Sequence, residues 1–573
     1  MKDLKNSGKL RNITITSYLT ISLNLFCIVF GILYILNSTS SLLWEIFGVI
    51  LTLTIFENLL YVYFNLHKKN ILRVKTRLLS YGFLIFIIFA IPCMMLGNLL
   101  LSSIYSNELI DTFGAYMLTY SGYFGILIYG ISFALFNLIK LINIDFLFLN
   151  YSFVIPNTRK YIRTKKVTRK IATIISRIIF VIGIIFAVVI IFGSFEVMTT
   201  FVAMVSGQFG TFFSIIFLAN TILLLTLKGR KRITKKYYKT AILGFFVSGC
   251  LLMPVLMTNF TVINARRSFT SAFGDDWQNQ IPSTTNNYFL TTPFSLTSYF
   301  LGAQPKDCTI EKNTLFYDEE GIKLYFDAYT PCNCKKDLPG ENSTIIRIHG
   351  GSWVSGDKGM MNMMQMNKYF AAQGYVVFDI QYGLDKNPLF ELDPLTPDYQ
   401  KGDFNIDDMM RHIGEFTKYL SLHSNEYGAN LDSVFISGGS AGGHLASAVA
   451  LAITSGNYTD IFGDNLTIRG LIPFYPANGQ MVFFGISGSE EFKHPEKLID
   501  ENSPPCLIFQ GTHDILNYFS ISENIRDTYR SKGNDECAIL WLPMAGHAAD
   551  FYFSGNYNQI FLYFMERFLF LYH

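Results

Sequence analysis

Acidic residues are scarce in the first 260 residues of this 573-residue chain. That part holds 7 Asp and Glu against 25 Lys and Arg, whereas residues 261–573 hold 36 acidic and 21 basic residues. Because the two parts nearly cancel, the formal charge of +3 is no sign of nucleic-acid binding. A mean hydropathy of +0.30 with 53 Phe indicates a membrane protein.

Basic residues are missing from every second connection between the apolar runs. We predict seven membrane spans, near 15–36, 42–66, 78–104, 113–139, 178–195, 201–227 and 240–260. The basic residues lie in 1–14, 67–77, 140–177 and 228–239, and none lies near 37–41, 105–112 or 196–200. This one-sided distribution predicts a cytoplasmic N-terminus. An odd number of spans then places everything after about residue 260 on the outer side.

A small-residue cleavage site is also missing after the first apolar run, so we expect a retained anchor and not a removed signal peptide. The spans carry no transport, channel or cofactor motif. Glu57 lies inside the second span, where an ionisable group is costly. We expect its carboxyl group to be neutral or paired within the helix bundle.

The rest of the chain divides near residue 310. We interpret 1–260 as a multi-span transmembrane domain and the polar stretch 261–310 as a juxtamembrane linker or collar. Aromatic residues near 288–300 could lie in the membrane interface, or they could dock on the domain formed by 311–573.

From residue 311 on, extended and helical stretches alternate. We predict strands at 322–330, 344–349, 375–381, 433–437, 468–475, 506–510 and 537–542, and helices near 361–373, 404–427, 441–454, 518–532 and 548–571. This alternation predicts an α/β fold with a doubly wound, mostly parallel sheet covered on both faces. In such sheets ligands bind at the carboxyl ends of the strands. Candidate site residues are therefore those that follow a strand.

The stretch Val434–Ala446 contains a G-x-S-x-G motif centred on Ser440. Strand-forming residues precede the motif and a small-residue helix start follows it, which is the context that it requires. Such a turn raises the serine hydroxyl above the sheet edge and points the Ala441 N–H toward a developing oxyanion. We interpret Ser440 as a nucleophile; the alternative is a glycine-rich turn without chemistry.

A second loop, His349-Gly350-Gly351-Ser352-Trp353, follows another predicted strand. Gly350 and Gly351 have no side chains, so their N–H groups can turn toward a bound oxygen and complete an oxyanion hole with Ala441. The alternative is a glycine turn closed by a packed tryptophan. We expect His349 and Trp353 to support the loop and not to act as a base.

Two further loops after strands carry a carboxylate and an imidazole, Asp514 and His547. In the chemistry that these residue types support, His547 takes the Ser440 proton and returns it to the leaving group. Asp514 then fixes the imidazole tautomer and stabilises the imidazolium. Other residues that could take these roles are His444, His494, His513, Asp500, Asp535 and Asp550. We expect a packing role for His444, because it lies in the helix start after Ser440.

The motifs HGGSW, SGGSAGGH, GTHD and AGH together resemble the α/β-hydrolase superfamily, in which the triad has the chain order Ser, Asp, His. More narrowly they are similar to HGG-x-W carboxylesterases, which include acetyl and feruloyl esterases, kynurenine formamidase and isoprenylcysteine methylesterase. The resemblance covers about 311–573. It implies the fold and the triad but not the substrate. Ser352 replaces a third glycine of the lipase-like branch, and Gly439 replaces a bulkier residue, which leaves acyl preference open.

Cysteine is rare, with eight residues in all. Five of them fall in the part predicted to face outward: Cys308, Cys332, Cys334, Cys506 and Cys537. The fold implied by the resemblance sets the strands that begin at Cys506 and Cys537 side by side, which predicts a disulfide between them. Cys308 could reach Cys332 or Cys334. The CxC pair has no matching histidines, and we expect neither a metal nor a cofactor.

The sequence leaves little room for a cap over the site. The connection from Tyr475 to Pro504 is short and contains Met481, Phe483, Phe484 and Phe492. We therefore expect an open mouth with an apolar rim. Such a mouth suits a small-molecule ester, an acylated glycan or a lipid-like ester presented at the membrane surface.

The sequence thus predicts a membrane-anchored serine carboxylesterase that forms an acyl-enzyme on Ser440. Its partners would be the ester substrate and the lipid bilayer, with no nucleic acid. Two alternatives stay open: a sensor or interaction protein that retains a hydrolase fold without turnover, and a serine peptidase of the same fold. A complete triad with two oxyanion elements favours the esterase, because a scaffold needs none of these parts.

Overall fold

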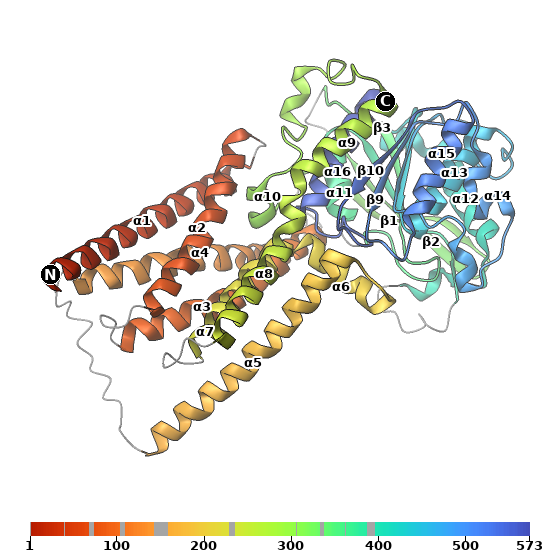
Figure 1. The fold of residues 1–573 in the computed structure, drawn as a ribbon. Helices are drawn as coiled ribbons and strands as arrows, with labels where there is room; N and C mark the ends of the chain where they lie inside the picture. Colours follow the sequence, from red (N-terminus) through yellow and green to blue (C-terminus); the bar gives the residue numbers. More distant parts are fainter. Residues whose placement is uncertain are drawn as a thin grey trace.

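The structure, a computed structural model, describes residues 2–38, 41–67, 74–103, 109–141, 159–227, 235–304, 306–332, 337–360, 363–386 and 396–573. Figure 1 shows an elongated helical region that contains the N-terminus, and beside it a region built around one large sheet that contains the C-terminus. Most of the connections predicted to be cytoplasmic, and Cys334, lie outside the described residues.

Nine helices make up the described part of the chain before residue 274. They are α1 (Lys2–Leu36), α2 (Leu42–His67), α3 (Val74–Ser103), α4 (Leu109–Leu141), α5 (Arg159–Phe192), α6 (Val197–Gln208), α7 (Gly210–Leu227), α8 (Lys235–Leu256) and α9 (Thr258–Phe273). Among the described residues, seven stretches are helical, long and apolar enough to cross a membrane: Thr14–Leu36, Leu42–Leu66, Thr76–Leu101, Thr112–Ile139, Val167–Phe192, Gly210–Leu227 and Tyr237–Phe273. Their number agrees with the prediction.

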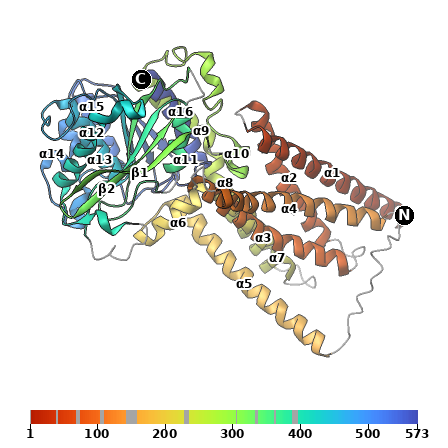
Figure 2. The same cartoon turned by 180° about the vertical axis from the view of Figure 1, so that it is seen from behind.

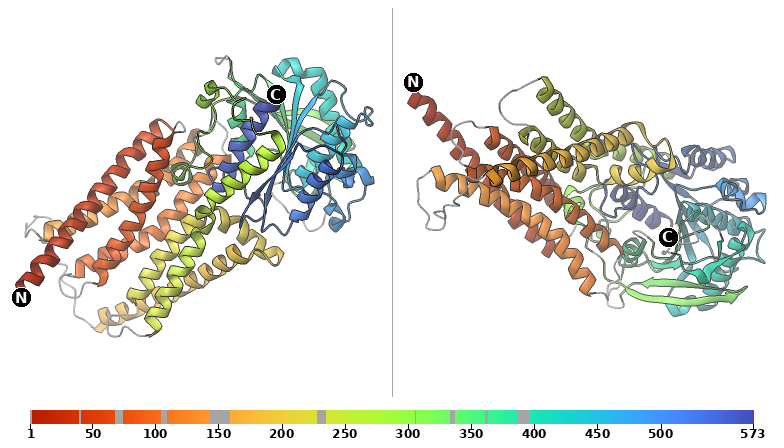
Figure 3. Two further views of the ribbon diagram at one scale, coloured as in Figure 1. Left: turned by 45° about the horizontal axis from the view of Figure 1, so that its top comes forward. Right: turned by 90° about the horizontal axis from the view of Figure 1, so that it is seen from below.

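Three of these stretches differ clearly in extent from the predicted spans. The span predicted at 178–195 corresponds to Val167–Phe192, which begins 11 residues earlier. The predicted span 201–227 is interrupted at Phe209, so that α6 and α7 are separate helices. The last apolar stretch continues from α8 into α9 and reaches 37 residues, well beyond the about 20 that cross a bilayer. Figure 3 shows this continuous rod running from the helical region onto the sheet region, where α9 packs against β10 and α16.

Polar side chains pair inside the helical region. Asn24 on α1 and Asn58 on α2 exchange two amide hydrogen bonds, of 2.9 and 2.8 Å. The Thr20 hydroxyl donates to the Glu57 carboxyl group at 2.8 Å, so Glu57 is paired within the bundle, as expected. Because buried polar groups without partners are costly, these pairs fix how α1 packs on α2.

The sheet has eight strands in the order β1-β2-β4-β3-β7-β8-β9-β10. Their bounds are β1 (Thr309–Glu319), β2 (Ile322–Thr330), β3 (Ser343–Ile348), β4 (Val376–Ile380), β7 (Asn430–Gly439), β8 (Ile468–Phe474), β9 (Cys506–Gly511) and β10 (Cys537–Leu542). The strands from β4 to β10 pair in parallel, whereas β2 is antiparallel to both β1 and β4, so the sheet is mixed. Strand β1 was not predicted, because no continuous apolar face marks it.

Helices cover the sheet on both faces (Figures 1 and 2). On the face away from the helical region lie α12 (Ile406–Tyr427), α13 (Ala441–Ser455), α14 (Glu490–Lys493) and α15 (Phe519–Ser531). On the opposite face lie α9, α11 (Met363–Ala371) and α16 (Asn556–Tyr572). Each face has its own buried apolar cluster: Ile346 and Ile348 of β3 belong to one, and Ile345 belongs to the other. A small second sheet pairs β5 (Leu384–Asp385) with β6 (Lys401–Gly402).

The segment after α9 docks on protein. Phe289 is buried, and the Arg567 guanidinium of α16 lies 5.7 Å from the centre of its ring. Within α10 (Leu296–Leu301), the Thr297 hydroxyl donates to the Trp44 carbonyl on α2. Phe289 therefore docks on the domain formed by 311–573, whereas Tyr299 and Phe300 are buried in the apolar cluster of the helical region, so the segment joins the helical region to α16.

Cys506 and Cys537 face each other in register on β9 and β10. The pairing of these strands agrees with the fold that the resemblance implied. Both residues are free thiols in the structure, so the predicted disulfide is not formed there. Burial, together with a hydrogen bond to Cys537, raises the pKa of the Cys506 thiol well above its usual value.

Candidate active site

Ser440 lies at the turn between β7 and α13, with φ 58° and ψ −120°. This backbone conformation is strained for a residue with a side chain. Close packing on both sides imposes it: a methyl group at Gly438 would lie 2.3 Å from the Gly442 carbonyl oxygen, and one at Gly442 would lie 2.2 Å from that of Ile348. The Ser440 N–H also donates to the Phe474 carbonyl at 3.0 Å. The two glycines of the motif are therefore required by packing.

Tyr475 fills the space beside Ser440 that Gly439 leaves. A methyl group at Gly439 would lie 3.0 Å from the Tyr475 hydroxyl oxygen. That hydroxyl donates to Asp550 Oδ1 at 2.7 Å, and the Tyr475 ring meets the His547 ring edge-on, with centroids 4.7 Å apart. The reason for a glycine at position 439 could not be predicted from the sequence; in the structure it leaves room for an aromatic ring that contacts the histidine.

Asp514 and His547 form a hydrogen-bonded pair. His547 Nδ1 and Asp514 Oδ2 are 2.8 Å apart, and the Asp514 carboxyl group is fully buried. Asp514 Oδ1 accepts the backbone N–H groups of Leu516 and Asn517 at 2.9 and 3.0 Å, which orients the carboxylate. Because a carboxylate only accepts hydrogen bonds, Nδ1 of the histidine carries the proton. The other ring nitrogen, Nε2, is left for proton exchange.

Asn517 connects the nucleophile turn to the Asp514 loop. Its side-chain amide donates to Ser440 Oγ at 3.4 Å and to the Tyr475 carbonyl at 2.5 Å. Among the hydrogen bonds of the described residues, none joins Ser440 Oγ to the His547 ring. Neither Asn517 nor Tyr475 was predicted to lie beside Ser440, because a single Asn or Tyr in a loop carries no motif. Only the position of Asn517 three residues after Asp514 could have pointed to it.

The loop after β3 brings Gly350 beside the serine. A methyl group at Gly350 would lie 3.4 Å from Ser440 Cβ and 2.7 Å from the Gly439 carbonyl oxygen. Gly351 has φ 115°, a conformation that favours glycine. Ala441 is the first residue of the 15-residue helix α13, so its N–H has no partner within the helix. The backbone of two segments, at Gly350 and at the start of α13, therefore flanks Ser440.

Trp353 ties this loop to α13 through His444. Trp353 Nε1 donates to His444 Nδ1 at 3.2 Å, and His444 Nε2 lies 2.7 Å from the Phe492 carbonyl oxygen, to which it donates. Burial lowers the pKa of His444 to about 4, so the ring is neutral at neutral pH. His444 thus has the packing role expected from the sequence.

His349 orders its own loop. Its Nδ1 lies 2.8 Å from the Gly350 carbonyl oxygen, and its ring stacks on that of Tyr382 with centroids 4.5 Å apart. Burial lowers the pKa of the imidazole, which keeps it neutral. These contacts agree with a supporting role.

Asp514 is hydrogen-bonded to His547, whereas the Asp550 carboxylate accepts the Tyr475 hydroxyl, and the remaining candidates lie elsewhere. Asp500 and Asp535 precede β9 and β10, so they lie at the amino ends of these strands, whereas Ser440 follows the carboxyl end of β7. His494 pairs with Glu496 at 3.3 Å. His513 is directed toward the end of α5: a methyl group at Gly193 would lie 3.2 Å from its Cγ. A hollow of about 700 Å³ lies at the amino ends of β9 and β10, lined by Arg469, Asn502, Asp535 and neighbours, and it contains none of the predicted site residues.

Part of the predicted apolar rim is exposed. Phe483 is 76% exposed on the short helical turn Gln480–Phe484, and Val482 beside it is 54% exposed. Met481 and Phe492 are instead buried in the core. Phe484 packs on Trp353, with ring centroids 6.2 Å apart, which sets this turn beside the HGGSW loop.

The comparisons with known proteins concern the sheet region. The BD-FAE family model matches residues 326–476, which include Gly350, Gly351 and Ser440. "Probable carboxylic ester hydrolase LipM" of Mycobacterium tuberculosis is 24% identical over 242 residues, 37% of this chain and 51% of its own length. "Esterase LipC" of the same organism is 22% identical over 243 residues, 38% of this chain and 55% of its own length. This chain spans about half the length of the curated relatives it matches.

Among solved structures, the apo form of Thermogutta terrifontis esterase 2 is similar, with 20% identity and a TM-score of 0.35 over 46% of this chain and 92% of that chain. The match of residues 326–476 confirms the resemblance that the HGGSW and SGGSAGGH motifs indicated. The chain therefore carries a BD-FAE domain of the α/β-hydrolase type at residues 326–476.

Proposed function

We propose that this protein is a membrane-anchored serine carboxylesterase, with Ser440 as nucleophile, His547 as general base and Asp514 as the acid that orients it. The observation that carries the proposal is the 2.8 Å hydrogen bond between His547 Nδ1 and the buried Asp514 carboxylate, at the same sheet edge as the strained Ser440 turn. The carboxylic ester hydrolase and esterase among the curated relatives support the same chemistry.

In the proposed mechanism, Ser440 Oγ turns from the Asn517 amide toward His547 Nε2 and attacks the ester carbonyl carbon. Its proton passes to Nε2, and the carbonyl electrons move onto oxygen, where the N–H groups of Gly350, Gly351 and Ala441 stabilise the charge. Collapse breaks the ester C–O bond, and the alcohol leaves with the proton from Nε2. Water then attacks the acyl-enzyme by the same route, which releases the acid and restores the serine.

The chemistry is tested with a fluorophosphonate probe and a short-chain aryl ester. Wild-type protein and Ser455→Ala, a control on α13 outside the site, should be labelled and active. Ser440→Ala should lose both labelling and hydrolysis while keeping its circular dichroism spectrum. Labelling retained in Ser440→Ala would contradict the nucleophile. A folded wild-type protein that no serine-directed probe labels would favour the non-catalytic sensor, and faster cleavage of a peptide than of an ester would favour the peptidase.

In this proposal residues 1–260 anchor the protein, 261–310 connect the two parts and 311–573 carry the chemistry. Basic residues on one side of the spans support a cytoplasmic N-terminus and an exoplasmic hydrolase domain. Protease added to intact cells or right-side-out vesicles should remove the hydrolase domain. Protection of that domain until the membrane is permeabilised would contradict the orientation.

A further inference from the structure

Helix α6 lies between two apolar helices that are long enough to be spans. The α5 stretch ends at Phe192 and the α7 stretch begins at Gly210. If both cross the bilayer, the 17 residues between them leave it and return to it, and α6 occupies 12 of these. Figures 1 and 2 show α6 turned sharply away from the direction of α5. The two spans therefore hold α6 at the outer membrane surface.

The loops of the candidate active site contact the α5–α6 corner, which is the end of α5 together with α6. A methyl group at Gly546, the residue before His547, would lie 2.9 Å from Ala203 Cβ on α6. A methyl group at Gly207 would lie 3.3 Å from the Met544 carbonyl oxygen of the same loop. In the loop after β9, His513, the residue before Asp514, contacts Gly193, the residue that follows α5. Both triad loops therefore touch the segment that joins the two spans.

Gln208, the last residue of α6, anchors the histidine loop. Its side-chain amide donates to the Ala548 carbonyl at 3.0 Å and accepts the Tyr552 N–H at 2.7 Å. The Gln208 backbone carbonyl accepts the Tyr299 hydroxyl at 2.8 Å. These buried bonds hold the segment that follows His547 against the helical region, so the site cannot turn away from the membrane surface as a separate body.

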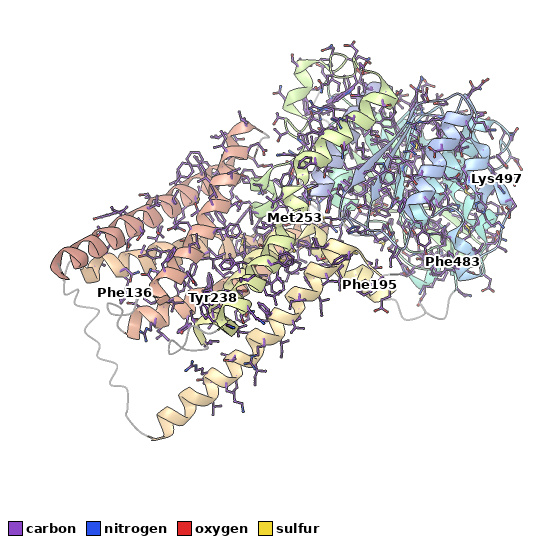
Figure 4. All side chains as sticks on the ribbon, in the orientation of Figure 1. Phe136, Phe195, Tyr238, Met253, Phe483 and Lys497 are labelled. Carbon is purple, nitrogen blue, oxygen red and sulfur yellow. The ribbon has the colours of Figure 1, made fainter. Side chains whose placement is uncertain are left out.

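Large apolar side chains are exposed around the same edge. In the described part of 302–573, eight large apolar side chains are exposed, and five of them lie in segments that follow β8 and β9: Val482, Phe483, Leu516, Tyr518 and Phe519. At the α5–α6 corner, Phe192, Phe195 and Phe201 are exposed. Figure 4 shows Phe195 and Phe483 on the same margin of the protein. An apolar surface of this kind marks contact with protein, lipid or ligand.

We propose that this apolar rim faces the outer leaflet, and that the site takes the ester of a membrane-resident amphiphile whose hydrocarbon chains stay in the bilayer. The proposal rests on the proposed esterase function and names its substrate class. Continuity with the spans identifies the occupant as lipid, because Phe195 and Phe201 belong to the segment that leaves and re-enters the membrane, and Phe192 is the last residue of the α5 span. The substrate would reach Ser440 by lateral diffusion, with the ester raised to the strand ends and the chains left along the rim.

The test compares two acetate esters that differ only in their hydrocarbon. The membrane ester is the 3-acetate of 1,2-di-O-hexadecylglycerol, in which both chains are ethers, in phosphatidylcholine vesicles that contain the full-length protein. The soluble ester is the 3-acetate of 1,2-di-O-methylglycerol, added to the same vesicles. With both esters, Ser440 takes the acetyl group while the alcohol leaves with the proton from His547, and water then hydrolyses the acetyl-enzyme, which releases acetate and restores the serine. We expect turnover of the membrane ester to exceed that of the soluble ester by at least about tenfold at equal total concentration.

A rim variant and a matched control then locate the effect. The rim variant is Val482→Ser with Phe483→Ser, and the control is Leu422→Ser, an 81% exposed leucine on α12. We expect the rim variant to lower the ratio of membrane-ester to soluble-ester turnover by about tenfold, because apolar contact with lipid is lost. The control should keep the wild-type ratio. Fluorophosphonate labelling of both proteins checks that the site is intact.

The outcomes separate the two proposals. Hydrolysis of the soluble ester alone, or a ratio that is the same in the rim variant and the control, overturns the membrane-substrate proposal and leaves the esterase in place. Absence of hydrolysis of both esters by labelled protein, with an aryl ester also uncleaved, overturns the esterase proposal itself. Hydrolysis that survives in Ser440→Ala means that another site or a contaminant acts, and it overturns both.

Discussion

The helical region and the sheet region of this chain distribute their polar and apolar side chains in opposite ways. The helical region buries polar pairs such as Asn24 with Asn58 and exposes large apolar side chains such as Leu53 and Phe89. The sheet region buries its apolar residues in two clusters on either side of the strands. Hydrocarbon offers no hydrogen bonds, so helices in it pair their polar groups internally, whereas water drives apolar groups inward. The side-chain distribution alone thus separates a surface suited to hydrocarbon from a surface suited to water.

The junction between the two regions, formed by the end of α6, by α9 and by the segment up to α10, follows neither pattern. Gln208 and Tyr299 form buried hydrogen bonds across it, and α9 continues the last apolar helix onto the sheet. If chemistry belongs to the sheet region alone, changes at the junction should affect only stability. If the two regions act as a unit, changes at the junction should alter turnover as well.

The largest losses of activity should come from the loops of the sheet region that carry the proposed triad. His547→Ala should abolish aryl ester hydrolysis nearly as completely as Ser440→Ala, because the ring of His444, four residues after the serine, is buried and already bonded to Trp353 and to the Phe492 carbonyl. Asp514→Asn should cost about 10⁴-fold in kcat, since tautomer control is lost but the imidazole remains. Steady-state kinetics measures both. Asp550→Asn, which removes the carboxylate bonded to Tyr475, serves as the control and should cost far less; an equal loss there would question the role of Asp514.

A smaller loss should follow from crowding the oxyanion loop. Gly350→Val should lower kcat by about 10²–10³-fold, because its side chain would press on the Gly439 carbonyl and shift an N–H donor. Gly114→Val is the matched change in the helical region, where an added methyl group meets no atom within 4 Å. The same kinetic assay compares the two. Normal turnover in folded Gly350→Val would remove this loop from the mechanism.

The junction itself is tested by Gln208→Ala. Two buried hydrogen bonds to the segment after His547 are lost, so we expect kcat for a soluble ester to fall by about tenfold, with a lower melting temperature. Asn220→Ala removes a buried hydrogen bond from α7 to the Ser176 carbonyl, wholly inside the helical region. It should lower the melting temperature without changing kcat. Equal kcat in both variants would mean that the helical region is only an anchor.

The smallest effect concerns pH and the loop support. The pKa of His444 falls from 6.5 to about 4 on folding, because burial disfavours the charged ring. Between these values the unfolded chain binds more protons, so the free energy of unfolding decreases as pH falls, by about 1.4 kcal/mol per pH unit. His444→Gln, whose amide can accept from Trp353 and donate to Phe492, should show a flatter decline. Thermal unfolding at pH 7 and pH 5 measures the difference, and parallel declines would contradict it.

Much of the sheet region could be predicted because its signals are local. All seven predicted strands are present with ends that differ by at most three residues, and β1, which lacks an apolar face, is the strand of the eight-stranded sheet that was not predicted. The strained Ser440 turn needed glycines at positions 438 and 442, and those glycines are visible in the sequence. Strand ends also marked Asp514 and His547, which the structure joins by a hydrogen bond.

The sequence by itself determined the seven apolar helices, the alternating strands and helices and the motif residues, because periodicity, apolar length and glycine spacing act between near neighbours. Tertiary structure alone decided that Asn517 and Tyr475 adjoin Ser440, that Phe209 separates α6 from α7, and that Gln208 holds a segment 340 residues away. Such contacts depend on how distant surfaces fit together. A glutamine or an asparagine satisfies them with one amide group, which leaves no pattern along the chain.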